Sequence, residues 1–126
     1  MATGFDDFPP VTSLLTRFNA ALNARDLPTM RSLLTPDTVF ENTYPPPDGE
    51  RFAGLSAVSA YWEQFFHASS ALHIEIERLL TTPAFAVQQW TYRWTGLDGS
   101  SGHIRGIDLF LIRDGLIAAK YSYVKG

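Results

Sequence analysis

Apolar residues in the first half of the chain recur at helical spacing. One such run predicts a helix that begins near residue 11 and buries Leu14, Leu15, Phe18 and Leu22. Asp26 can cap a short second helix, and Pro36 would end that helix. A third helix is predicted for residues 56–67, and the large side chains of its buried face are Val58, Trp62, Phe65 and Phe66.

Several other segments alternate between apolar and polar residues, as strands do. A first strand is predicted for residues 38–44, with one face formed by Phe40, Asn42 and Tyr44. A short extended piece is predicted near residue 51, and four long strands near residues 72–81, 84–95, 103–113 and 116–124. Helices first and an antiparallel meander last predict an α+β fold with the helices on one face of the sheet. Residues 1–10 are predicted to form a loose arm, and residues 11–126 a single domain.

The two central strands each have one face that suits the interior. In the strand at 84–95 this face carries Ala86, Gln88, Trp90, Tyr92 and Trp94, and its large rings need a covering layer of helices. In the strand at 103–113 the inward face carries Ile104, Gly106, Asp108, Phe110 and Ile112. A carboxylate in such an apolar wall must be paired, hydrogen-bonded or protonated. Asp108 is therefore the strongest candidate for a functional group, and the alternative is a buried structural carboxylate.

The opposite face of the strand at 103–113 is also apolar, because it carries Ile107, Leu109 and Leu111. An exposed face of this kind is too apolar to remain in contact with water. We therefore expect a homodimer that forms through the outer face of the sheet.

The turn at Asp114-Gly115 decides which residue lies opposite Asp108. A two-residue turn would place Tyr121 there. A three-residue loop with a bulge at the glycine would place Lys120 there instead, with Ser122 on the same inner face. Periodicity leaves both registers open, and the resemblance described below favours the second.

Composition limits the classes of partner and cofactor. The chain of 126 residues has a net charge of −3 and scattered Lys and Arg residues, so we expect neither nucleic acid nor membrane as a partner. It contains no cysteine, which excludes thiolate chemistry, and its three histidines are too far apart for a metal site. We expect no metal and no cofactor. No apolar stretch reaches transmembrane length, and acidic residues stand where a signal peptide would carry Lys or Arg, which predicts a cytoplasmic protein.

Several segments resemble the ketosteroid isomerases and the wider nuclear-transport-factor-two-like superfamily, which includes the SnoaL-like polyketide cyclases. They are RFNAALNARDL at 17–27, DTVFEN at 37–42 and IDLF at 107–110. The stretch from Glu41 through the three prolines at 45–47 to Gly54, and the ending KYSYVKG at 120–126, resemble the SnoaL-like branch. The resemblance implies a cone-shaped fold in which a curved antiparallel sheet of about four long strands and a short one wraps around three N-terminal helices. It also implies a deep internal pocket and frequent dimers.

The resemblance implies a partial set of catalytic residues. Ketosteroid isomerases use a Tyr where this chain has Phe18, and an Asp as general base where it has Asn42. Their protonated oxyanion-donor Asp is matched by Asp108. Standard ketosteroid isomerase activity is therefore not expected. Limonene epoxide hydrolases need an Asp-Arg-Asp group, of which one inward Asp is found here. The polyketide cyclases use a single pocket Asp as acid/base and are the nearer analogy.

These observations favour a pocket for a small hydrophobic molecule, with cofactor-independent isomerase or cyclase chemistry on a carbonyl compound. The alternative is a non-catalytic module of the same fold that binds a hydrophobic ligand or dimerises. The candidate catalytic residues are Asp108, Asn42 and Lys120. Glu41 would replace Asn42 if the other face of the first strand pointed inward. The candidate ligand-binding residues are Phe18, Phe40, Tyr44, Trp62, Phe66, Gln88, Trp90, Tyr92 and Phe110. If Lys120 lies beside Asp108, the carboxylate is ionised and can act as a base; otherwise it is protonated and can act as a donor.

Overall fold

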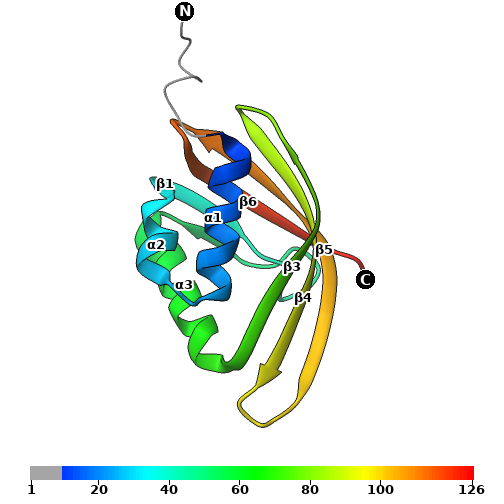
Figure 1. Cartoon of the computed structure of the whole chain (residues 1–126). Helices are drawn as coiled ribbons and strands as arrows, with labels where there is room; N and C mark the ends of the chain where they lie inside the picture. The colour runs from blue at the N-terminus through cyan, green and yellow to red at the C-terminus, as the bar shows by residue number, and fades with distance from the viewer. Residues whose placement is uncertain (1–9) are drawn as a thin grey trace, which may run out of the picture.

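A curved sheet with helices on one face makes up the computed structural model, which describes residues 10–126 (Figure 1). The helices are α1 (Val11–Asn23), α2 (Leu27–Ser32) and α3 (Leu55–Ala68). The strands are β1 (Leu34–Glu41), β2 (Arg51–Ala53), β3 (Ser69–Thr81), β4 (Phe85–Gly96), β5 (Ser101–Arg113) and β6 (Leu116–Val124). The α+β class is confirmed. The predicted N-terminal arm lies, except for residue 10, outside the described residues. Each helix within residues 10–126 is too short or too polar to span a bilayer.

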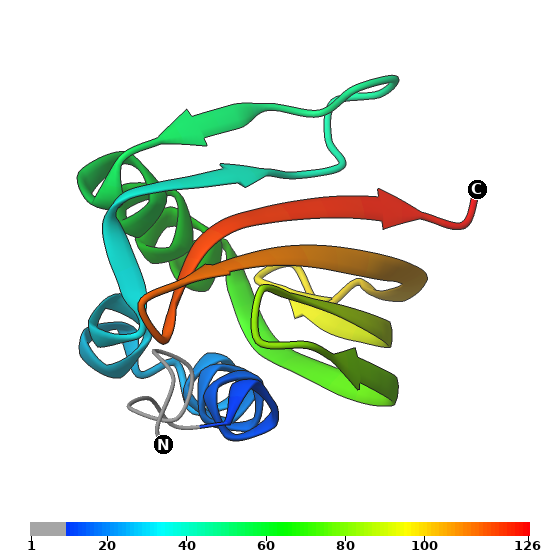
Figure 2. The same cartoon turned by 90° about the horizontal axis from the view of Figure 1, so that it is seen from above.

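The six strands form one open sheet in the order β2-β1-β6-β5-β4-β3 (Figure 2). The six extended segments predicted from the residues are all strands, whereas the antiparallel sheet of about four long strands and a short one that the resemblance implies differs in two respects. The sheet has six strands, and β1 runs parallel to its neighbour β6. Local alternation identifies strands but not their neighbours, so the pairing of the first long strand with the last had no signature in the sequence.

The first strand begins and ends earlier than predicted. Leu34 already pairs with Ile117, so β1 includes Pro36, which lies where the register with β6 shifts. The strand ends at Glu41, because the next residue, Asn42, turns the chain by accepting a hydrogen bond from the backbone N–H of Glu50 at 2.7 Å.

The predicted inward faces of the central strands are confirmed. Ala86, Gln88 and Trp90 of β4 are buried, as are Gly106, Asp108 and Phe110 of β5. In the register, Gln88 lies opposite Asp108 and Trp90 opposite Gly106. The core therefore forms between this face of the sheet and the apolar faces of α1 and α3.

Neither predicted register of the last hairpin is correct. The turn has two residues, because Arg113 pairs with Leu116. A bulge at Ala118 then shifts the pairing by one residue, so that Ser122 lies opposite Asp108 and Lys120 lies opposite Phe110. Because of this bulge, Lys120 and Ser122 point to the inner side of the sheet, which is the side that the three-residue loop would also have given them.

Candidate functional site

A cavity of about 390 Å³ lies between the helices and the inner face of the sheet. All three candidate catalytic residues, Asn42, Asp108 and Lys120, line it. Of the candidate ligand-binding residues, the lining contains Phe18, Trp62, Gln88, Trp90 and Tyr92. The cavity is also lined by several residues that the sequence did not indicate as site residues. Among them are Asn19, Leu22, Tyr61, Phe65, Ile74, Trp94 and Ser122.

Four candidate ligand-binding residues lie away from the cavity. Phe40 and Phe110 are core residues that pack edge to face against the ring of Phe18, at centroid distances of 6.3 and 6.2 Å. Phe66 stacks near Trp62 on α3, with the guanidinium of Arg25 5.8 Å from its ring centroid. Tyr44 is 75% exposed, because β1 ends at Glu41 and the chain leaves the sheet before it reaches this residue.

Asp108 is held by donors on both carboxylate oxygens. The hydroxyl of Ser122 donates to Oδ1 at 2.6 Å, and the amide of Gln88 donates to Oδ2 at 3.1 Å. The side chain of Asp108 is 2% exposed. Because each of these neighbours donates a hydrogen, both carboxylate oxygens serve as hydrogen-bond acceptors.

Lys120 supplies the positive charge beside this carboxylate. Its Nζ lies 3.6 Å from Oδ1 of Asp108 and donates to Oγ of Ser122 at 2.8 Å. The same ammonium lies 5.3 Å from the ring centroid of Phe40 and 5.7 Å from that of Trp62, within the range of cation–π attraction. Among the described residues that line the cavity, Asp108 and Lys120 are the ones with charged side chains.

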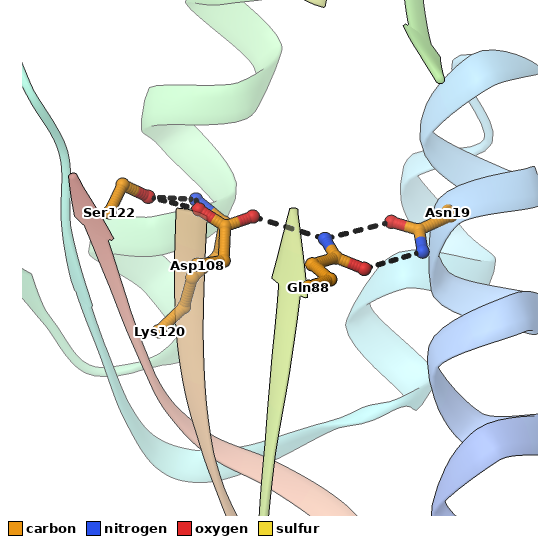
Figure 3. Close-up of polar contacts among 5 residues, drawn as sticks. All are labelled: Asn19, Gln88, Asp108, Lys120 and Ser122. Atoms are coloured by element: carbon orange, nitrogen blue, oxygen red, sulfur yellow. Dashed lines mark hydrogen bonds and ion pairs between the residues drawn. The ribbon is translucent and has the colours of Figure 1, made fainter. Parts of the chain in front are cut away.

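A pair of amides continues the hydrogen-bond chain to α1 (Figure 3). Asn19 donates to Oε1 of Gln88 at 2.8 Å, and the Gln88 amide nitrogen returns a bond to Oδ1 of Asn19 at 3.3 Å. This reciprocal contact fixes the orientation of Gln88, so that its NH₂ group and not its oxygen faces Asp108. Asn19 was missed as a site residue, although it is a polar residue on the buried face of a predicted helix.

Asn42 lines the cavity, but its side chain also organises the loop that follows β1. Its Oδ1 accepts from the Glu50 backbone, and its side chain is hydrogen-bonded to the Tyr61 hydroxyl. Glu41, the alternative base, lies outside the cavity lining and is 3.8 Å from the guanidinium of Arg51. The inward face of β1 is therefore the predicted one.

Three buried donors in the cavity wall have no hydrogen-bond partner within the described residues. They are the indole N–H groups of Trp62 and Trp90 and the hydroxyl of Tyr92. Burial raises the pKa of the Tyr92 phenol far above its usual range, so this hydroxyl stays protonated at ordinary pH. An unmet buried donor costs about 1–3 kcal/mol. These donors favour a ligand that carries oxygen acceptors.

A family model for the SnoaL-like domain matches residues 15–120. The chain belongs to this family. The match includes every strand and helix that contributes to the cavity, although α1 is included only from Leu15 and β6 only as far as Lys120. Comparison with curated protein sequences finds no match to this SnoaL-like domain.

Solved structures confirm the nuclear-transport-factor-two-like fold. An NTF2-like protein of unknown function from Mesorhizobium loti is 30% identical, with 91% of this chain and 90% of that chain covered and a TM-score of 0.75. An LEH-like epoxide hydrolase from M. tuberculosis is 18% identical, with coverage of 90% and 80% and a TM-score of 0.77. RV0760c from Mycobacterium tuberculosis, in complex with estradiol-17β-hemisuccinate, is 19% identical, with coverage of 89% and 91% and a TM-score of 0.77.

Proposed function

We propose that this SnoaL-like domain binds a small hydrophobic carbonyl compound and catalyses a cofactor-independent isomerisation or cyclisation. Asp108 is the base that removes a proton from the carbon next to the carbonyl group. The observation that carries the proposal is a carboxylate buried in the wall of a mainly apolar cavity.

The hydrogen bonds of Asp108 leave room for this role. A carboxylate oxygen has two lone pairs. Ser122 and Lys120 approach Oδ1, whereas Oδ2 has the Gln88 amide as its protein donor. One lone pair of Oδ2 can therefore accept a proton from a ligand. The ammonium of Lys120 can stabilise the negative charge that then develops on the substrate oxygen.

The size and chemistry of the cavity support a hydrophobic ligand with oxygen atoms. The wall combines aromatic rings with the unmet donors of Trp62, Trp90 and Tyr92. The same fold in RV0760c holds estradiol-17β-hemisuccinate, a fused-ring ligand with ester and carboxylate oxygens. Within residues 10–126, the cavity wall contains neither a second carboxylate nor an arginine. This composition disfavours the Asp-Arg-Asp chemistry of limonene epoxide hydrolases.

Exchange of α-hydrogens provides a direct test of base catalysis. We expect the protein to accelerate hydrogen–deuterium exchange at the α-carbons of 2-tetralone, a bicyclic ketone, in D₂O followed by NMR. Asp108→Asn should reduce the acceleration about a hundredfold or more, because an amide does not accept the proton. Asp114→Asn is the matched control: it makes the same chemical change at an exposed turn residue with φ of 54°, a conformation that Asn tolerates.

A non-catalytic binding module is the second candidate, and it is favoured by Phe18 and Asn42 at the positions of the Tyr and Asp of ketosteroid isomerases. A binding module predicts that 2-tetralone raises the melting temperature of the protein by mass action, while the α-hydrogens of 2-tetralone exchange no faster than in buffer. Binding without exchange in the wild-type protein, or unchanged exchange in Asp108→Asn, would contradict the catalytic proposal.

A further inference from the structure

The side chains of Lys120, Ser122 and Asp108 form a continuous path for a proton (Figure 3). Lys120 and Ser122 are two residues apart on β6 and therefore project from the same face of the strand. The Ser122 hydroxyl accepts from Nζ at 2.8 Å and donates to Oδ1 of Asp108 at 2.6 Å. The serine thus connects the ammonium to the carboxylate through two short hydrogen bonds.

The surroundings of this pair become unfavourable for charge when a ligand displaces water. The side chains of Lys120 and Asp108 are 12% and 2% exposed, and the rings of Phe40 and Trp62 flank the ammonium. An apolar ligand that fills the cavity removes the remaining solvation of both ions. The cost of desolvating an ion pair can exceed its Coulombic attraction, and transfer of one proton then gives a neutral amine and a neutral acid. Ser122 provides the route for this transfer.

We propose that Lys120 is a nucleophile that forms an imine with an aldehyde or ketone bound in the cavity. The inference rests on the proposed function in requiring a carbonyl ligand, and it adds a covalent step that base catalysis does not need. A desolvated lysine in an apolar pocket is a suitable amine for this chemistry. The acid group that the reaction needs, Asp108, is already in contact with the amine through Ser122.

The step balances without any further reagent. Nζ passes a proton to Ser122, which passes its own proton to Asp108. The free amine attacks the carbonyl carbon, and one proton moves from nitrogen to oxygen through the same side chains, which gives a carbinolamine. Its hydroxyl then leaves as water with the proton of Asp108, while the nitrogen lone pair forms the C=N bond. The ammonium and the carbonyl become a protonated imine and one water, and Asp108 is a carboxylate before and after.

The sequence makes this proposal simple to test, because the chain contains two lysines, Lys120 and Lys125. Lys125 is exposed just beyond β6 and provides an internal reference. The full chain would be incubated at neutral pH with 6-methoxy-2-naphthaldehyde and sodium cyanoborohydride, which reduces an imine to a stable secondary amine. Peptide mapping by mass spectrometry then measures labelling at each amine. We expect Lys120 to be labelled roughly tenfold faster than Lys125, because the cavity holds the aldehyde beside it.

Variants separate the proposed relay from simple exposure of an amine. Lys120→Arg should abolish the cavity adduct, and Ser122→Ala should slow labelling at Lys120 but not at Lys125. Lys125→Arg is the matched control and should leave labelling at Lys120 unchanged. Labelling of Lys120 at or below the rate of Lys125 in the wild-type protein would overturn the proposal even if a variant failed to fold. Labelling of Lys120 without exchange of the α-hydrogens of 2-tetralone would support the imine and contradict base catalysis. Exchange of these hydrogens without labelling of Lys120 would support base catalysis and contradict the imine.

Discussion

Two glycines on β5 lie beneath the indole rings of β4. Gly106 lies opposite Trp90, and Gly102 lies opposite Trp94. A methyl group added at either glycine would come within 2.8 Å of the facing indole. At Gly106 it would also overlap the backbone carbonyl oxygen of Tyr123 on β6, whereas at Gly102 its nearest neighbours are atoms of the Trp94 ring. The absence of a side chain at these positions lets the aromatic wall of the cavity lie flat on the sheet.

Gly106→Ala is expected to be the more damaging of the two substitutions. A backbone oxygen held in a ladder cannot move aside, whereas the half-buried ring of Trp94 can rotate. Overpacking of this kind costs about 1–3 kcal/mol in the free energy of unfolding, and we expect Gly106→Ala to show it and Gly102→Ala to show less. Urea denaturation measures both values. Equal losses in the free energy of unfolding would show that the contact with the indole, and not the contact with the backbone oxygen, causes most of the destabilisation.

Residue identity pointed to part of the cavity lining, including Asp108, and left several lining residues unnamed. Asp108 stands among apolar residues on one face of its strand, and that contrast is visible in the sequence. The same contrast marks Asn19, a polar residue on the buried face of α1. Tyr44 could not be placed correctly, because the hydrogen bond between Asn42 and Glu50 that ends β1 joins residues of a loop with no periodic pattern.

At the level of elements, one acidic side chain ties three strands together on the outer face of the sheet. Glu77 lies at a bulge of β3. Its carboxylate accepts from Gln89 at 2.9 Å and Thr91 at 2.6 Å on β4, and from two nitrogens of Arg105 on β5 at 3.1 and 2.8 Å. Hydrogen bonds from Arg105, followed by Thr91, lower the pKa of Glu77 to about 2.

This contact predicts a component of stability that disappears in acid. A carboxylate whose pKa is lower in the folded than in the unfolded protein favours folding above its ordinary pKa of 4.5, and the contribution is lost as the pH falls toward 2. Glu77→Gln should therefore melt at a lower temperature than the wild type near neutral pH, and the difference should shrink between pH 4.5 and about 2. Thermal denaturation followed by circular dichroism measures the difference. Glu75→Gln, at an exposed residue of the same strand, is the control.

Element positions were predicted more accurately than element pairing. The four long strands and the third helix lie close to their predicted limits, because alternation and helical spacing are local properties. The bulge at Ala118 was not predictable, since a small residue in a short strand leaves no hydrophobic signal. Yet that bulge determines that Ser122, and not Lys120 or Tyr121, faces Asp108. The contacts of the site, and part of its wall, therefore needed the structure.

At the level of the whole molecule, the outer face of β4, β5 and β6 carries an apolar patch. Phe85 lies opposite Leu111, and Ile107 lies opposite Tyr123. These four side chains are 42–61% exposed. A contiguous patch of this kind is the type of surface that a second subunit covers in a twofold dimer.

We expect the protein to be a dimer at micromolar concentration and Leu111→Lys to convert it to a monomer, because a charge within the patch would be desolvated by the partner. Size-exclusion chromatography with light scattering gives the mass of each form. His103→Lys adds a charge to an exposed residue of the same strand but away from the patch, and it should leave the dimer intact. A monomeric wild-type protein would contradict the expectation.

The parallel pair of β1 and β6 has a consequence for the order in which the protein folds. Strand β6 lies between β1 and β5, so the β1–β2 ribbon has no place in the sheet until β6 has been inserted (Figure 2). The pairing of Phe40 with Lys120 joins segments that leave the ribosome far apart in time. Asp108, Gln88 and Asn19 are all synthesised before the ammonium and the serine that complete the site. Completion of the proposed site is thereby linked to completion of the sheet, because a nascent chain without its last strand has Asp108 but lacks Lys120 and Ser122.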